Sequence, residues 1–249
     1  MPTLTATYDP EHVRVGLQIG GFTDGTPVTF TRDGVAVRGA EGVTPSSGSF
    51  FVWDYEAPFN VPAHYTATNG AQTADASATI LVSDAWLRAP GLPSLDMPIL
   101  PREVPNISRP RPTATLRPIG RRAAVVLSGT RSAGEFTLNL WTQTDEEADA
   151  LLSLVDEAPA ALLLMPGARA VDHVYVALGS AEESPLGGYR PAGAESWTLW
   201  SIAATIVDSP IGGVFGDPTA SYQAVLSAYA SYAALGAAHP TYLSVLRGV

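Results

Sequence analysis

The sequence predicts a mainly β protein: an N-terminal immunoglobulin-like or fibronectin-like β-sandwich, a second β-domain with one covering helix, and a short C-terminal helical segment. Three observations support this fold class. Short segments alternate apolar and polar residues with a period of two, as half-buried strands do. The 249 residues include 23 glycines and 21 prolines, which favour turns over long helices. Before residue 217, one stretch has the capping signals and apolar spacing of a helix.

The first domain is predicted to span residues 1–87, which contain seven short strand-like segments, as in a constant-type immunoglobulin sandwich. These segments are 3–8, 13–19, 28–30, 35–37, 50–55, 65–68 and 77–82. Asp33-Gly34 predicts a type I′ hairpin, because both residue types tolerate positive φ. Asn69-Gly70 begins the expected turn between the last two strands. The chain has no cysteine to link the sheets, so Trp53 is the expected core anchor.

Residues 88–112 are predicted to form an extended, semi-rigid connector that lies along a surface. Seven of these residues are proline, which cannot donate to a strand ladder and biases the preceding residue toward extended geometry.

The second domain is predicted over 113–216, with strands at 123–127, 135–141, 160–165, 174–178 and 197–207. The first two are expected to flank a turn at 129–134. A helix is predicted at 144–158: Thr144 is a capping residue, Glu147 is its capping-box partner, and Pro159 ends it.

Residues 217–249 are predicted to be helical. Asp217-Pro218 fits a helix start, and Gly236 can end that helix. A Ser/Thr-Tyr pair recurs every ten residues, at 221, 231 and 241. This tail either packs on its own domain or docks onto a neighbouring subunit.

Charge is segregated along the chain. Residues 88–131 hold eight arginines against two acids, whereas residues 1–87 carry a net charge of −6 and residues 132–249 one of −10. Three roles for this arginine-rich stretch remain open: an intersubunit or interdomain contact, a solvated linker, or a nucleic-acid contact. The first is favoured, since unlike charges select partner and register, and the net charge of −10 for the whole chain opposes binding to a phosphate backbone.

An enzyme is not expected. The absence of cysteine excludes thiol catalysis and cysteine-ligated metals, and the four histidines lack metal-ligand spacing. No phosphate-binding loop, dinucleotide fingerprint or Gly-x-Ser-x-Gly elbow occurs. The prediction is therefore no catalytic residue, no cofactor and no metal.

Several motifs together resemble minor tail proteins of distal-tail type from phages and prophages of actinobacteria. The resemblance covers most of the chain. It is carried by Tyr8-Asp9-Pro10, the segment Trp53-Asp54-Tyr55-Glu56-Ala57-Pro58-Phe59 before Val61-Pro62, Trp86-Leu87-Arg88, Gly129-Thr130-Arg131-Ser132, Phe136-Thr137-Leu138, Thr144-Asp145-Glu146-Glu147-Ala148 and the closing Tyr-x-x-x-Leu repeats.

The resemblance implies a structural virion protein whose ring links the tail tube to the hub and receptor-binding parts. It also implies that residues 113–216 form the ring, as a hexamer in preference to a trimer, and that the partners are copies of itself and other tail proteins. The chain departs from well-known members in placing the sandwich first. The candidate intersubunit contacts are Arg102, Arg109, Arg111, Arg117, Arg121, Arg122, Tyr222, Tyr229, Tyr232 and Tyr242.

The alternative function is a cell-wall carbohydrate-binding module that would expose Trp53, Tyr55 and Tyr65 to a host glycan. The start of the sequence lacks the basic and apolar regions of a signal peptide, and its longest apolar run is too short to span a bilayer. We therefore expect folding and assembly in the host cytoplasm, followed by incorporation into the virion tail, without membrane insertion or specific nucleic-acid binding.

Overall fold

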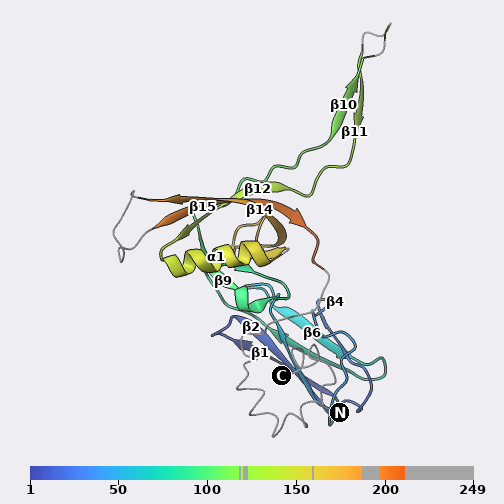
Figure 1. Cartoon of the computed structure of the whole chain (residues 1–249). Coiled ribbons are helices and arrows are strands. Elements are labelled where there is room, and N and C mark those ends of the chain that lie inside the picture. Colours follow the sequence, from blue (N-terminus) through green and yellow to red (C-terminus); the bar gives the residue numbers. More distant parts are fainter. Residues whose placement is uncertain (118, 120–122, 159, 187–196, 211–249) are drawn as a thin grey trace.

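The computed structural model describes residues 1–117, 119, 123–158, 160–186 and 197–210. These residues form a sandwich, a barrel and a projecting arm (Figure 1). Strands dominate, so the predicted mainly β fold class is confirmed. The helical segment expected at 217–249 lies outside the described residues. Within the described part, no helix is long and apolar enough to cross a membrane.

The sandwich consists of a three-stranded sheet and a four-stranded sheet with one core between them. The first sheet has the order β1(Thr3–Asp9), β2(Arg14–Gly20), β5(Phe50–Asp54). The second has the order β4(Val35–Ala36), β3(Thr29–Arg32), β6(Ala63–Thr68), β7(Thr73–Ala78). Buried Leu17, Phe30 and Tyr65 come from both sheets and fill the space between them.

The seven strands expected in the sandwich are present, with one shift in position. Asp33 and Gly34 both have positive φ, 49° and 84°, in the turn between β3 and β4, as a type I′ turn requires. The strand expected at 77–82 instead spans Thr73–Ala78. The Asn69 side chain accepts hydrogen bonds from the backbone N–H groups of Ala71 and Gln72, which closes the turn early.

Trp53 is not the core anchor that the sequence predicts. The alternation along β5 is as expected, but Phe50 and Val52 pack against the core while Trp53 lies half-buried on the opposite face. Trp53 is paired with Gly16 of β2, where a Cβ atom would lie 2.9 Å from the indole ring. The missing side chain of Gly16 therefore makes room for Trp53 on the outer face.

The second unit is a closed barrel of six strands, here called the barrel. Its order is β12(Glu135–Thr142), β15(Thr198–Val207), β14(His173–Pro185), β13(Ala161–Leu164), β8(Ala85–Arg88) and β9(Met97–Pro101), with β9 pairing back to β12. Leu138, Leu163 and Ile202 are fully buried in its core.

The connector predicted at 88–112 is corrected in part. Arg88 ends β8, and Met97–Pro101 form β9, so both belong to barrel strands. The 3-10 helix η1(Pro93–Leu95) lies in the loop between these strands. Prolines lack a backbone N–H group and are tolerated in β9 because this strand forms only a short ladder of backbone hydrogen bonds with β12. That ladder covers two residue pairs, at Pro101 and Leu100.

The two strands expected on either side of the turn at 129–134 are present but do not pair with each other. β11(Val125–Ser128) pairs instead with β10(Thr113–Leu116), a segment not predicted as a strand. β12 pairs with β15 along its whole length.

The helix prediction is confirmed by α1(Asp145–Glu157), which packs its buried Leu151 and Leu154 into the barrel core. Thr144 Oγ1 accepts a hydrogen bond from Glu147 N at 3.2 Å, so Thr144 is the N-cap.

β13 joins the two cores. All four of its residues are buried; Ala161 and Leu163 belong to the barrel core, whereas Leu162 and Leu164 belong to the sandwich core. A continuous apolar run of this kind is typical of a strand buried on both faces. The sandwich and the barrel are thus packed together through β13.

Candidate functional site

The first candidate surface is the arm, defined here as residues 108–135. Its base is a reciprocal pair of backbone hydrogen bonds between Ser108 and Glu135, both 2.8 Å. Bonds from Ser132 N to Pro110 O and from Gly129 N to Pro112 O, both 2.9 Å, continue this ribbon into β10 and β11. The arm therefore projects from the barrel as an ordered two-stranded ribbon (Figure 1).

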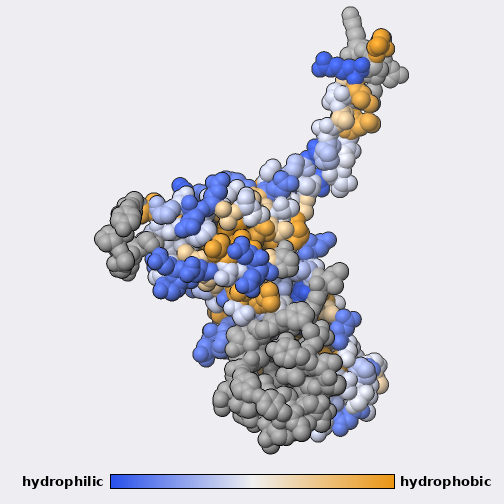
Figure 2. Space-filling view, viewed as in Figure 1, coloured by the Kyte–Doolittle hydropathy of each residue, from blue (hydrophilic) through white to orange (hydrophobic). Residues whose placement is uncertain are grey.

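The arm carries apolar side chains that no second layer of the described residues covers. Leu116, Val126 and Leu127 are 51–61% exposed. Figure 2 shows apolar colour on the projecting ribbon. The pairing of Ala114 with Leu127 places Ala114, Leu116 and Leu127 on one face, because residues two apart on a strand share a face. An isolated two-stranded hairpin is marginally stable in water, so this face is suited to a partner.

Three predicted contact residues lie together on the arm: Arg109, Arg111 and Arg117, all exposed. Arg109 Nε donates to Ala133 O at 3.0 Å, and within the described residues none of the three forms an ion pair. Arg102 lies apart from them; it is exposed next to β9, and its backbone N donates to Asn139 O. The other predicted contacts, Arg121, Arg122, Tyr222, Tyr229, Tyr232 and Tyr242, lie outside the described residues.

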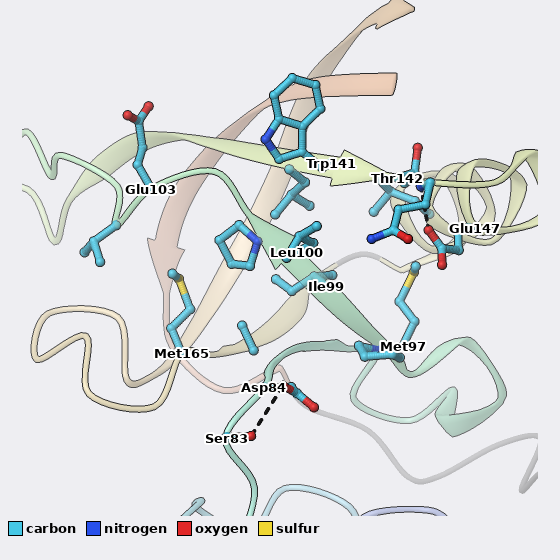
Figure 3. A pocket seen from close by; sticks show the side chains of 17 residues that line it. Ser83, Asp84, Met97, Ile99, Leu100, Glu103, Trp141, Thr142, Glu147 and Met165 are labelled. Atoms are coloured by element: carbon cyan, nitrogen blue, oxygen red, sulfur yellow. Dashed lines mark hydrogen bonds between the residues drawn. The ribbon is translucent and has the colours of Figure 1, made fainter. Parts of the chain in front are cut away.

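The second candidate surface is an open groove of about 560 Å³ beside β9 and the C-terminal end of β12 (Figure 3). Its apolar centre is formed by Ile99 and Leu100, with Met97, Trp141 and Met165 around them. Leu100 is 43% exposed and Val104, at the edge, is 58% exposed. The sequence analysis did not predict this groove, because it arises from the pairing of β9 with β12 across 39 residues of sequence.

Among the described residues, three carboxylates stand around the groove and no arginine lines it. Figure 3 shows Asp84, Glu103 and Glu147 at separate positions about the apolar centre. Glu103 accepts from Asn139 Nδ2 at 3.0 Å, and Glu147 accepts from Gln143 N at 2.7 Å. Their hydrogen-bond donors are neutral, and the described part of the chain supplies no cation to any of the three. The groove is therefore an apolar site with a negative edge.

A third feature, the junction, is buried between the sandwich and the barrel and centres on Arg88. The Arg88 side chain is 1% exposed, and its guanidinium donates to Tyr55 O and Val13 O of the sandwich. Its Nε lies 3.8 Å from Asp96 Oδ2. Burial raises the pKa of Asp96 to about 7, although the positive charge of Arg88 acts to lower it.

A second polar contact joins the two units beside Arg88. Glu56 of the sandwich forms an ion pair with Arg38 and accepts a hydrogen bond from the Tyr175 hydroxyl of the barrel at 2.9 Å. Arg38 in turn donates to Ser209 Oγ and Pro210 O at the end of the barrel. This network uses Glu56 of the segment Trp53–Phe59, in which the sequence points to the aromatic residues Trp53 and Tyr55 and not to Glu56.

The aromatic residues proposed for glycan binding are separated by the fold. Tyr65 is 1% exposed, and its hydroxyl donates to Asp54 Oδ2 at 2.9 Å; burial raises the pKa of this hydroxyl and the charge of Asp54 raises it further. Trp53 is covered on one ring face by the guanidinium of Arg14, 3.7 Å from the ring centroid. The Tyr55 hydroxyl accepts a hydrogen bond from Arg14 Nη1. These three side chains do not form one exposed platform.

Within the described residues, no three His, Asp or Glu side chains form a group that could hold a metal ion. The arm and the groove are therefore the candidate surfaces, because within the described residues the arginines of the arm and the carboxylates of the groove have no ion-pair partner. The sequence matches no model of a known protein family, and no curated protein is detectably similar to it.

Proposed function

We propose that the chain is a self-assembling structural component of a phage tail tip. In this proposal the barrel and its arm form a ring, with the hexamer favoured over the trimer, and the ring links the tail tube to the hub and receptor-binding parts. The phage context rests on the sequence resemblance described above. Self-assembly rests on the arm.

The observation that carries the proposal is the exposed apolar face of the arm. Leu116 and Leu127 lie exposed on one face of a two-stranded ribbon that no other described element covers. Leaving such side chains in water forgoes about 25 cal/mol for each Å² of apolar surface. The ribbon is nevertheless held by backbone hydrogen bonds as far as its base, so it is presented in a fixed direction. A pre-ordered apolar element on the surface is suited to association, because little conformational entropy is lost on binding.

The buried junction supports the same proposal. Arg88, Glu56 and β13 fix the sandwich to the barrel, from which the arm projects. A ring component must hold its contact surfaces at constant angles, since a heterologous interface closes into a ring only at a fixed rotation.

The test is the mass and shape of the purified full-length protein. Sedimentation velocity combined with electron-microscopy class averages is expected to give a closed ring of defined mass. Raising the salt concentration is expected to shift the mass toward the monomer, because exposed charges are screened. Immunogold labelling is expected to place the protein at the tail tip of virions. A protein that stays monomeric at all concentrations, and that is missing from virions, would contradict the proposal.

A further inference from the structure

We propose that the groove beside β9 and β12 receives the β10–β11 arm of a second copy of this chain. This inference rests on the proposed self-assembly and names the two surfaces that make the contact. The interface would be heterologous, because an arm on one copy meets a groove on the next.

The chemistry of the two surfaces is complementary. The arm offers the apolar face of Ala114, Leu116 and Leu127, while the exposed Arg111 and Arg117 flank this segment and alternate to its other face. The groove offers an apolar centre at Ile99 and Leu100, flanked by Asp84, Glu103 and Glu147. Neither the arm arginines nor these carboxylates have an ion-pair partner among the described residues. Docking would cover both apolar surfaces and bring the basic arm next to the negative edge of the groove.

The geometry favours a second copy over the same copy. The arm leaves the barrel at Glu135, the first residue of β12, whereas the groove lies at Leu140–Gln143, near the last residue of that strand. The ribbon then runs away from the barrel (Figure 1). Eight residues from Ser108 to Leu116 extend it by roughly 26 Å at about 3.3 Å per residue. The arm of one copy therefore points away from its own groove and can reach a neighbour.

The size of the two elements also matches. The groove has a volume of about 560 Å³ and is open to the surface, and its lining comes from strands, loops and the first turns of α1. A two-stranded ribbon presents few side chains on each face, so a few residues such as Leu116 and Leu127 would fill it. Hydrophobic anchors seated in a pocket and surrounded by charges are typical of the centre of an interface.

The test uses the absence of native cysteine, which allows site-specific disulfides without background thiols. Two single variants of the full-length chain, Leu116→Cys on the arm and Val104→Cys at the groove, are mixed and oxidised under mild conditions. We expect a covalent heterodimer that forms on the order of a hundredfold faster than from undocked chains, because docking raises the local thiol concentration from micromolar toward millimolar. Peptide mapping identifies the 104–116 disulfide.

The matched control replaces the groove variant with Val35→Cys, another exposed valine, which lies on β4 of the sandwich. Equal cross-linking of Leu116→Cys to both valine positions would overturn the inference. The mass of the unmodified protein separates the two proposals. A ring without the 104–116 cross-link would reject the groove as the receiving site and leave self-assembly standing. A protein that is monomeric at every concentration would reject both.

Discussion

Arg88 and Arg117 come from the same arginine-rich stretch and have opposite environments. Arg88 is 1% exposed and binds two backbone carbonyls of the sandwich, with Asp96 nearby. Arg117 lies exposed on the arm without an ion-pair partner in the described part of the chain. The comparison separates two uses of arginine: one holds the sandwich and the barrel together, and the other remains available to a second molecule. Mutations at the two sites should accordingly change different properties.

The largest effect is expected at the junction. Arg88→Met keeps much of the side-chain volume but removes the positive charge next to Asp96 and leaves two carbonyl oxygens without their donor. Removing one partner of a buried charge pair costs about 3–5 kcal/mol, so the free energy of unfolding should fall by about that amount in denaturant titrations. Arg111→Ala, on the exposed arm, should change it by less than about 0.5 kcal/mol. Equal losses of unfolding free energy for the two variants would contradict the different roles given to Arg88 and to the arginines of the arm.

The next effect concerns the arm. Leu116→Ser combined with Leu127→Ser should weaken self-association by about a hundredfold, at about 1.4 kcal/mol for each leucine. The monomer should melt at an unchanged temperature, because both side chains are already exposed. Concentration-dependent sedimentation measures the first quantity, and calorimetry of the dilute protein measures the second. A double variant that assembles normally would show that the apolar face of the arm is not buried in the assembly.

A pH dependence is expected from Asp96. Burial raises its pKa from 3.8 to about 7, so the folded protein holds a proton that the unfolded chain releases. The stability associated with that proton is present below pH 4 and is lost as the pH rises toward 7, with a slope of up to about 1.4 kcal/mol per pH unit. Asp96→Asn should remove this slope when unfolding is measured between pH 4 and 7. If the free energy of unfolding of both proteins changes with pH in the same way, Asp96 is not the source of the slope.

The smallest effect is expected at the negative edge of the groove. Glu103→Gln should weaken self-association by about 0.2–1 kcal/mol, as for an exposed ion pair, and should reduce its dependence on salt. Glu11→Gln, on the sandwich, is the matched control and should change neither quantity. If the two variants behave alike, Glu103 does not pair with an arginine of the arm.

Sequence patterns predicted the elements whose signals are local. Thr144 and Glu147 mark the start of α1, Asp33-Gly34 specifies a hairpin, and the alternating strands give the sandwich. Sequence patterns could not predict which face of β5 points into the core, because both faces carry apolar residues. The side that accommodates Trp53 is decided by Gly16, which lies on a different strand.

The candidate surfaces depend on long-range pairing, which local patterns do not encode. The proline-rich residues 97–101 can form a barrel strand because their ladders of backbone hydrogen bonds with β8 and β12 are short. This pairing creates the groove and directs residues 108–135 into the arm. The charge segregation did identify the arm arginines, although composition alone could not separate Arg88 from them.

The most direct test of the arm as the element of self-assembly is to remove it without disturbing its base. Pro112 O accepts a hydrogen bond from Gly129 N, which is the bond that closes a two-residue turn. Replacing residues 113–128 by Asn-Gly should therefore give a folded barrel with a type I′ turn. Sedimentation velocity is expected to find a ring for the intact protein and a monomer with unchanged thermal stability for the shortened one. A shortened protein that still forms the ring would contradict the account.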